Sequence, residues 1–456
     1  MHSEFGRYGA QRSFPGIASA GLQGAVGSAR LLQLSRWAVS SNPQPQLEAR
    51  RQMPSHPRTS PAAASLRPSV FASLAAQFKT LEHPPIPLHL GDTYRQPPAE
   101  ARYEHALGRL PSSCYAYSNP LGMEDLRHAF AERVGRDGLT GLTADNVHVT
   151  SGGTGAITIA LQTWLEPGDE ILVLAPFWPL VKGMAMNIGA VAVEVPFYDG
   201  LRRGQTVAEL LQPYVTSRTV ALYLTSPNNP CGTVLDRAEL EAVAAFCVKH
   251  GLWALADEAY EHYAYAPNQH HFLAAMPGMA TRTASVFTVS KSYALAGMRV
   301  GFLCGDPAWL DVARRVATHN VYNVPLICQL SALGAIEHGE AWIRETRDLY
   351  SEANNLVVRK LQADFRPAAG GGYIFADLAA DLRGRPLMGW LSDLLRDGVS
   401  LSPGDAFGRH FGTWVRVCFT AVPPDALDLA LDRMNRSLER LRQPPGPRAG
   451  AAAVPA

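Results

Sequence analysis

Short apolar runs alternate with amphipathic segments through the middle of the chain. The runs are nearly continuous in Val, Ile, Leu, Ala and Phe, and they lie at 146–151, 170–175, 190–195, 220–225, 252–257, 285–290 and 298–304. Strands that are covered on both faces have this pattern. Helix-like segments, for example 236–250, separate several of the runs. The alternation predicts an α/β domain whose mostly parallel sheet is covered by helices.

The pattern changes beyond about residue 330. A long helix is predicted at 341–362, a Gly-rich hairpin-like stretch at 370–378 and a closing helix at 425–442. These elements predict a second, smaller α+β domain. We therefore expect a large domain over 121–325 and a small C-terminal domain over 326–442.

The two ends of the chain differ in composition from the rest. Residues 1–68 are rich in Ser, Ala, Gly, Gln, Pro and Arg, and Glu4 and Glu48 are their only acidic residues. This composition is compatible with an organelle transit peptide, but the many Pro and Gln residues favour a disordered extension. The tail, 443–456, is rich in Pro, Gly and Ala and is also predicted to be disordered.

Composition and charge exclude several classes of protein. With 47% hydrophobic residues and a net charge of +1, the chain can bury a large core and has no general attraction to nucleic acid or anionic membranes. No apolar stretch is long enough to cross a bilayer. The six cysteines are scattered without metal-like spacing, which argues against disulfides and a metal site. We expect a cytoplasmic protein, although the N-terminal composition leaves a mitochondrial one open.

Polar residues follow five of the predicted strands. They are Ser151 to Thr154, Trp178, Asn229, Asp257 and Lys291. In open α/β sheets, ligands bind beyond the carboxyl ends of the strands. These residues therefore predict an active site at one edge of the sheet.

Lys291 is the residue with the most informative chemistry. It follows a buried strand, and Arg299 lies eight positions further on. An amine in such a place can condense with an aldehyde cofactor if burial keeps part of it unprotonated. A lone lysine is usually an exposed surface residue, so the neighbouring motifs decide between these interpretations.

Eight motifs in order give the chain a specific resemblance. They are LGDTY, YSNPLGMEDLR, SGGTGA, PFWP, SPNNPCG, ADEAYEHY, SKSYALAGMRVG and WVRVCFT. Over roughly residues 86–440 the sequence resembles the class I/II aminotransferases of pyridoxal-phosphate (PLP) fold type I. The resemblance implies a large domain with a mostly parallel mixed sheet, a smaller α+β domain, and a homodimer. Residues 69–120 would contribute to the small domain and the dimer interface.

The resemblance also implies that Lys291 carries pyridoxal 5'-phosphate as a Schiff base. Asp257 would pair with the pyridinium nitrogen and keep it protonated, which makes the ring an electron sink. Asn229 and Tyr260 would donate hydrogen bonds to the phenolic oxygen of the cofactor. The structural alternatives are a helix cap for Asp257, a turn for Asn229 and a core position for Tyr260.

A phosphate site is implied at the start of a predicted helix. Gly153 and Thr154 would offer backbone N–H groups, which attract anions at a helix N-terminus. Ser290 and Arg299 would complete the site, and the hydroxyl of Thr288 could serve in the same way. By itself, GGTG is most often a turn.

The remaining expected site residues surround the cofactor and the substrate. Trp178 would stack on the pyridine ring, and Tyr117 would reach the phosphate bound by the neighbouring subunit. Arg416 would hold the substrate α-carboxylate as a bidentate partner, with a backbone N–H of Gly91 nearby. The alternatives are a core tryptophan, a loop tyrosine and an internal salt bridge of Arg416.

The function implied by the resemblance is transfer of an amino group between an amino acid and a 2-oxo acid. A PLP-dependent lyase, synthase or decarboxylase of the same fold is the main alternative, because PLP supports several reactions. A non-catalytic regulatory protein is a weaker one, since residues 1–68 contain no DNA-binding pattern. The stretch 318–329 offers no cation for a distal carboxylate, which favours neutral or aromatic substrates near Tyr94, Tyr322 and Asn323.

Overall fold

The structure is a computed structural model that describes residues 59–66, 77–78 and 81–443. The tail predicted over 443–456, apart from Gln443, and most of the extension predicted over 1–68 lie outside the described residues. Within that extension, Pro61–Ala64 form the short helix α1, whose first turn is capped by the Ser60 hydroxyl. The limits expected for the large and small domains stay predictions.

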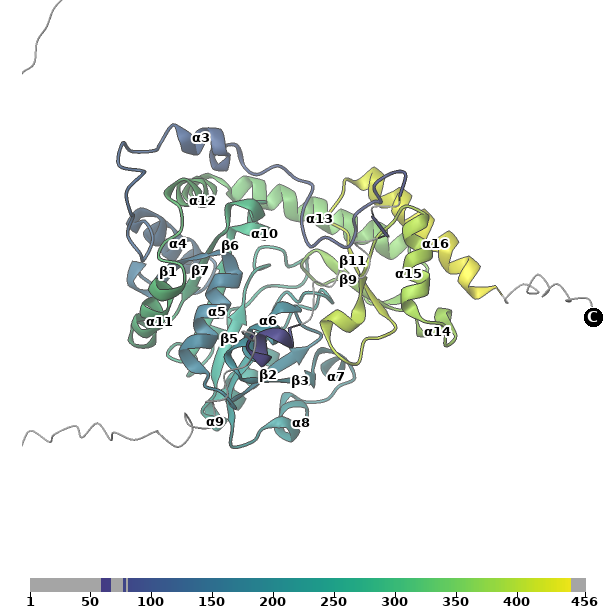
Figure 1. Cartoon of the computed structure of the whole chain (residues 1–456), viewed down its shortest axis with the longest axis horizontal. Coiled ribbons are helices and arrows are strands. Elements are labelled where there is room, and N and C mark those ends of the chain that lie inside the picture. The colour runs from purple at the N-terminus through teal and green to yellow at the C-terminus, as the bar shows by residue number, and fades with distance from the viewer. Residues whose placement is uncertain (1–58, 67–76, 79–80, 444–456) are drawn as a thin grey trace, which may run out of the picture. The chain divides into compact units, whose positions relative to one another are not determined.

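A seven-stranded mixed sheet forms the larger of two sheets (Figure 1). Its strands, in spatial order, are β1 (Val147–Ser151), β7 (Val300–Cys304), β6 (Thr283–Thr288), β5 (Trp253–Asp257), β4 (Thr219–Thr225), β2 (Glu170–Ala175) and β3 (Val191–Pro196). β7 is antiparallel to both of its neighbours, and the other neighbouring pairs are parallel. The prediction of a mostly parallel mixed sheet is confirmed.

Apolar side chains cover both faces of this sheet. Along β2, Ile171 and Val173 belong to one buried cluster, and Leu172 and Leu174 belong to another. Successive side chains of a strand point to opposite faces, so a continuous apolar run is what two covered faces require. Helices α5, α6 and α11 supply residues to the first cluster, and α8 and α9 supply residues to the second.

The helices around the large sheet have the following bounds: α3 Tyr103–Leu107, α4 Glu124–Arg136, α5 Gly152–Trp164, α6 Leu180–Ile188, α7 Tyr198–Arg202, α8 Val207–Leu211, α9 Arg237–His250, α10 Val289–Ser292, α11 Pro307–Asn320 and α12 Leu326–His338. Helix α9 illustrates how the sequence sets such bounds. The Asp236 side chain caps its start together with Glu239, and Gly251 ends it in a left-handed conformation.

A smaller antiparallel sheet has its own helices and its own core. Its strands run in the order β10 (Ser402–Pro403), β11 (Trp414–Cys418), β9 (Tyr373–Asp377) and β8 (Asp364–Phe365). The accompanying helices are α13 Glu340–Lys360, α14 Ala379–Leu382, α15 Leu387–Arg396 and α16 Pro424–Arg442. Residues of these elements form one buried apolar cluster. The predicted α+β unit is therefore present, and its Gly-rich stretch is the end of the loop that joins β8 to β9.

The predicted strands differ from the observed ones mainly where the site begins. The run at 285–290 was expected to be extended throughout, but β6 ends at Thr288, whose hydroxyl accepts a hydrogen bond from Ser290 N at 3.2 Å and starts α10. The run at 298–304 becomes a strand only at Val300, because Arg299 has a left-handed backbone (φ 54°). Among the described residues, no helix is both long and apolar enough to cross a membrane.

Candidate active site

The large sheet brings the polar strand ends to one edge. β1, β4, β5 and β6 run in the same direction, so their carboxyl ends share that edge. Antiparallel β7 starts there, since Val300 lies opposite Ser151 and Gly301 lies opposite Thr288. Arg299, directly before β7, therefore joins residues that follow the parallel strands. Asp257 pairs with Val286, so Lys291 and Asp257 lie beyond neighbouring strands at this same edge.

Lys291 is a partly buried amine at the end of the short helix α10. Its Nζ donates a hydrogen bond to the carbonyl oxygen of Gly91. Burial lowers the pKa of this amine, and the nearby guanidinium groups of Arg416 and Arg299 lower it further, against the opposing effect of Asp92. The Lys291 amine is therefore more easily deprotonated than that of a surface lysine, as a nucleophilic amine requires.

A pocket surrounds the Lys291 amine. It is lined by Gly91, Asp92, Thr93, Tyr260, Tyr263, Lys291, Tyr350, Gly371, Gly372, Tyr373 and Thr420. Both sheets contribute, because Tyr373 starts β9 of the small sheet and Lys291 follows β6 of the large one. Gly91 must be glycine for steric reasons, since a Cβ there would lie 2.7 Å from the Tyr373 hydroxyl.

Asp257 is a buried carboxylate at the end of β5. It accepts a hydrogen bond from the Tyr223 hydroxyl at 2.8 Å and another from Ala259 N at 3.2 Å. The second bond closes a turn, and no helix starts at Asp257, so the helix cap considered as its alternative role is not present. Burial raises the pKa of Asp257 to about 6, although the Tyr223 hydrogen bond opposes the rise. A cation beside this carboxylate would restore its charge.

Four side chains form a ring of contacts between the two sheets. Arg416 Nη1 donates to Asn229 Oδ1 at 3.0 Å, and Asn229 Nδ2 lies 3.5 Å from the Tyr260 hydroxyl. The Tyr260 and Tyr373 hydroxyl oxygens are 2.7 Å apart. The Arg416 guanidinium closes the ring by lying over the Tyr373 ring, 4.6 Å from its centroid. Asn229, Tyr260 and Arg416, three of the expected site residues, are thus brought together.

Arg416 is a buried cation that lacks a carboxylate partner among the described residues. Its side chain is 5% exposed, and its Nη2 donates to His89 O at 2.7 Å and to Ser402 Oγ at 3.2 Å. Its Nε is buried without a hydrogen-bond partner in that part of the chain. The internal salt bridge considered as an alternative is not present there. A buried, incompletely bonded guanidinium is suited to an anionic ligand.

The start of α5 forms a cradle beside Arg299. The helix has no side-chain cap, so its first N–H groups are available to an anion. Gly152 has a positive φ (70°), and a Cβ on it would lie 2.3 Å from the Arg299 guanidinium. Gly153 and Thr154 follow in the first turn, and Thr288 Oγ1 donates to Ser290 Oγ at 2.8 Å beside it. The expected phosphate residues are therefore neighbours.

Two expected residues lie outside this group of contacts. Trp178 is partly buried and packs against the core cluster that contains β2 and α5. Tyr117 is 86% exposed, and its ring lies 5.1 Å from that of Tyr322. Asn323, proposed as lining, donates to the hydroxyl of Ser118 in the loop that carries Tyr117.

The sequence interpretation missed two tyrosines of the site. Tyr223 lies within the apolar run of β4, and a tyrosine there looks like a core residue. Tyr373 follows a Gly-rich turn and begins β9, with no feature that marks its hydroxyl as functional. The signal in both cases is a buried phenol, which normally needs a hydrogen-bond partner. That partner became visible only through contacts between residues far apart in sequence.

The fold and the comparisons with known proteins define the chain as an enzyme that transfers amino groups. It belongs to the class I and II aminotransferases, because the model of that family matches residues 89–434. The chain is 31% identical to aromatic-amino-acid aminotransferase 2 of Thermococcus litoralis, with 74% of this chain and 87% of the relative covered. It is 32% identical to the arginine–pyruvate transaminase of Pseudomonas aeruginosa, with 72% and 84% covered.

A solved structure supports the same assignment. A single mutant of Thermus thermophilus aspartate aminotransferase superposes with a TM-score of 0.76 at 27% identity, over 84% of this chain and 100% of the other. The names of these relatives mention aromatic, arginine and aspartate substrates. They therefore agree on amino-group transfer and differ in the amino acid.

Proposed function

We propose that this aminotransferase uses PLP, with Lys291 as the catalytic amine and Arg416 as the anchor of the substrate carboxylate. The observation that carries the proposal is a buried guanidinium, without a carboxylate partner in the described part of the chain, in the same site as an amine whose pKa burial lowers. An amino acid and its 2-oxo acid share a carboxylate and differ at Cα. A site that holds the first group and reacts at the second needs a cation and an amine.

The residues at the sheet edge fit the chemical groups of PLP. The free N–H groups at the start of α5, together with Ser290 and Arg299, would hold the phosphate. Asp257 would pair with the ring nitrogen, because a cation would stabilise this buried carboxylate, whose pKa burial raises. Asn229 and Tyr260 would donate to the phenolic oxygen, and Trp178 would lie against the ring.

Each residue then has a defined task in the reaction. When bound, PLP acts as an electron sink for the electrons left at the substrate Cα. Arg416 fixes the carboxylate and so orients the Cα–H bond, and Lys291 Nζ takes the proton from Cα. Tyr260 holds its hydroxyl proton in a hydrogen bond, and burial keeps its pKa well above the ordinary value. Asp257 would hold a cationic ring nitrogen, which would in turn keep the carboxylate ionised.

The pocket favours an amino acid with a neutral or aromatic side chain. Its lining includes Tyr260, Tyr263, Tyr350 and Tyr373, and Lys291 is the cation among the described lining residues. Arg95, in the neighbouring loop, is bonded to Glu345 at 2.8 Å and so is not available for a distal carboxylate. Tyrosine rings supply apolar surface with a polar tip, which suits an aromatic side chain.

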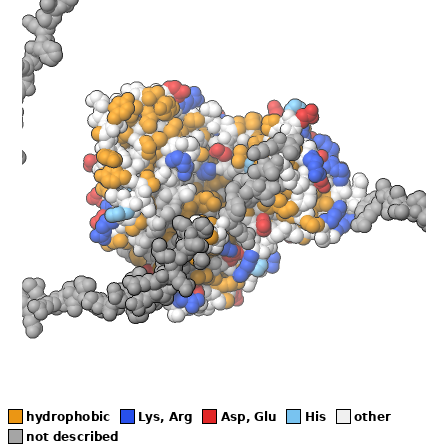
Figure 2. All heavy atoms as spheres, viewed as in Figure 1, with side chains coloured by type: hydrophobic (Ala, Val, Ile, Leu, Met, Phe, Trp, Pro, Cys, Tyr) orange, Lys and Arg blue, Asp and Glu red, His pale blue; other side chains and the backbone are white. Residues whose placement is uncertain are grey.

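A second copy of the chain is proposed to cover the surface around Tyr117. Several large apolar side chains are exposed there or in the neighbouring segments: Tyr103, Leu107, Tyr115, Tyr117, Val321 and Tyr322. Figure 2 shows hydrophobic side chains gathered over the part of this face where α3 and α12 lie. Contiguous exposed apolar surface marks an interaction site. In a homodimer, Tyr117 would reach the phosphate in the neighbouring site.

Sedimentation of the full chain tests this part of the proposal. We expect a dimer, and we expect Tyr117→Asp to weaken it.

A half-reaction tests the proposed chemistry directly. The PLP-loaded full chain is mixed with an amino acid alone, and the absorbance of the lysine-bound cofactor is followed. We expect one equivalent of 2-oxo acid per site and loss of that band, and then its recovery when a 2-oxo acid is added. Lys291→Ala should lack both the band and the turnover, with a loss of at least about 10³-fold. Ammonia or sulfide release without this cycle would instead indicate lyase chemistry.

A further inference from the structure

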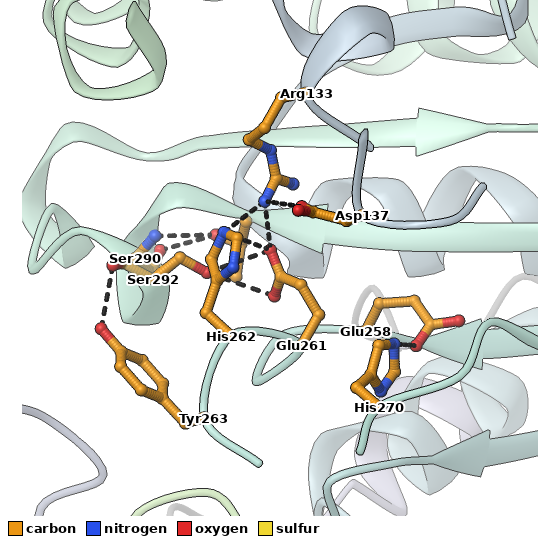
Figure 3. Close-up of polar contacts among 10 residues, drawn as sticks. Arg133, Asp137, Glu258, Glu261, His262, Tyr263, His270, Ser290 and Ser292 are labelled. Carbon is orange, nitrogen blue, oxygen red and sulfur yellow. Dashed lines mark hydrogen bonds and ion pairs between the residues drawn. The ribbon is translucent and has the colours of Figure 1, made fainter. Parts of the chain in front are cut away.

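Figure 3 shows a cluster of buried charged and polar side chains around Glu261, which does not line the pocket around Lys291; we call it the cluster behind the proposed active site. It joins three segments: α4, which supplies Arg133, the turn after β5, which supplies Glu261, and α10, which supplies Ser292. None of these three residues lines the pocket around Lys291. The proposed chemistry uses none of them.

Glu261 is the centre of the cluster. Its Oε1 lies 3.1 Å from Arg133 Nη1, and the side chains of Glu261 and Arg133 are only 2% and 7% exposed. The Ser292 hydroxyl lies 3.2 Å from each carboxylate oxygen of Glu261. The Tyr263 hydroxyl donates to the carbonyl oxygen of Ser292 at 2.9 Å. Two side chains of the 261–263 turn therefore hold the residue that follows Lys291.

The order of residues in the two segments shows which site residues this contact connects. Glu261 directly follows Tyr260, and Ser292 directly follows Lys291. Tyr260 and Lys291 line the pocket, whereas Glu261 and Ser292 meet each other behind it. The hydrogen bond between Glu261 and Ser292 therefore constrains the distance and orientation between their chain neighbours, Tyr260 and Lys291.

A buried ion pair is a costly way to stabilise a fold. Removing two charges from water often costs as much as their attraction returns, and apolar residues of similar volume can replace them without loss. Arg133 is also held over the Phe130 ring, 4.9 Å from its centroid, so its guanidinium is fixed on a second side. What the pair provides that apolar packing cannot is a directed acceptor for the Ser292 hydroxyl. Directional bonds specify position rather than stability.

We infer that Glu261 and Ser292 are positioning residues, which hold Lys291 in register with Tyr260 through the hydrogen bond between them, with Arg133 fixing Glu261. The inference rests on the proposed role of Lys291 as the catalytic amine. Glu261 and Ser292 touch neither substrate nor cofactor in this assignment. Their effect reaches the reaction through the direction in which the Lys291 side chain leaves the backbone.

The test is a serine series in the PLP-loaded full chain. Ser292→Ala removes the hydroxyl, and Ser292→Thr keeps it. Ser331→Ala is the matched control, because Ser331 on α12 is a fully buried serine whose hydroxyl bonds to the carbonyl oxygen of Ala101. Four quantities are measured: kcat and KM for the amino donor, the pH midpoint of the lysine–cofactor absorbance, and the thermal midpoint of unfolding. The pH midpoint of the absorbance reports the surroundings of the Lys291 amine independently of turnover.

We expect Ser292→Ala to lower kcat about tenfold with KM within about twofold, because misplacement of a reacting group acts on the chemical step. The pH midpoint should move by about half a unit or more, since it depends on the surroundings of the amine. Ser292→Thr should restore both values, and Ser331→Ala should leave both at the wild-type level. Equal effects of Ser292→Ala and Ser331→Ala, or an unchanged pH midpoint in Ser292→Ala, would overturn the inference.

Glu261→Gln provides a second, independent arm. Gln keeps an acceptor for Ser292 but removes the charge, so the pH midpoint should move in the same direction as in Ser292→Ala and by a smaller amount. A midpoint equal to that of the wild-type chain would contradict the role of Glu261. If the wild-type chain itself forms no lysine–cofactor band, the proposed function fails instead. The two failures are therefore distinguishable.

Discussion

Buried charged side chains lie in two neighbouring places of the molecule, but only in one of them do they form an ion pair. Behind the sheet edge, Arg133 and Glu261 are paired at 3.1 Å and bonded to further side chains. In front, the buried guanidinium of Arg416 has no carboxylate partner among the described residues, and its Nη atoms donate to neutral oxygens instead. Both places lie next to Lys291, one through Ser292 and the other across the pocket.

The difference separates groups that hold the structure from groups that await a ligand. A buried charge without a countercharge is costly, so one that lies at a candidate site suggests that a ligand completes it. A buried charge with a partner serves the chain itself. This comparison predicts opposite consequences for changes in the two places: loss of activity in front, and loss of stability or alignment behind.

The largest effect is expected when Arg416 is replaced by Met. Two charge-assisted hydrogen bonds to a carboxylate, each worth about 1.5–3 kcal/mol, would be lost, so kcat/KM should fall roughly 10²- to 10⁴-fold. The lysine–cofactor absorbance should remain, because Arg416 is not assigned to cofactor binding. Steady-state kinetics with a series of amino acids measures the loss. A fall limited to a few-fold would show that another group holds the carboxylate.

The matched change behind the edge is Arg133→Met. It leaves Glu261 without its cation, and breaking a buried pair costs about 3–5 kcal/mol of unfolding free energy. Arg416→Met should lower the unfolding free energy less than Arg133→Met does, since it loses hydrogen bonds to neutral oxygens but leaves no buried countercharge unpaired. Urea unfolding of the two cofactor-free variants compares them. Equal destabilisation by both would erase the distinction between the two places.

A pH dependence is expected from Asp257 when the chain is free of cofactor. Its pKa is raised by burial from 3.8 to about 6, so the folded state binds a proton more tightly than the unfolded state. The stability from this protonation is full below pH about 4 and is lost as the pH rises through about 6. Asp257→Asn should therefore be more stable than the wild-type chain at pH 8, by up to about 3 kcal/mol, and lose this advantage near pH 4.

Denaturant unfolding at several pH values measures this difference. Glu261, whose pKa burial raises to about 7 against the effect of Arg133, adds a slope of the same sign to both chains. The comparison between Asp257→Asn and the wild-type chain removes that contribution. A difference that does not vary with pH would mean that Asp257 is ionised in the cofactor-free fold.

The smallest effect is expected from Tyr373→Phe, which removes the hydroxyl bonded to Tyr260 at 2.7 Å. One neutral hydrogen bond contributes about 1 kcal/mol, so kcat should fall by about 2- to 10-fold. Tyr265→Phe is the control, because that buried hydroxyl bonds to the carbonyl oxygen of Gly371 rather than to a proposed catalytic group. If both variants have the same kcat, the Tyr373 hydroxyl has no special role in the site.

The sequence predicted the front of the site better than the back. Asp257, Lys291 and Asn229 follow apolar strands, and the rule that ligands bind at strand ends locates such residues without a structure. The antiparallel direction of β7 could not be predicted in this way, because a buried strand has the same apolar pattern in either direction. That direction is what brings Arg299 to the edge.

The cluster behind the site was not predictable from local patterns. Arg133 and Glu261 are far apart in sequence, and each alone looks like an ordinary charged residue of a helix or a turn. Tyr223 and Tyr373 look like core residues for the same reason. Their roles depend on which segments the tertiary fold brings into contact, and that information is not contained in the periodicity of one segment.

The most direct test of the account is reduction of the PLP-loaded chain with borohydride, followed by digestion and mass spectrometry. The account predicts one cofactor adduct per chain, located on Lys291, and no adduct in Lys291→Ala. It also predicts that Arg416→Met keeps the adduct although its turnover is lost. Labelling of a different lysine, or a chain that retains no adduct after reduction, would contradict the central claim that the buried amine in front of the sheet edge is the group that reacts.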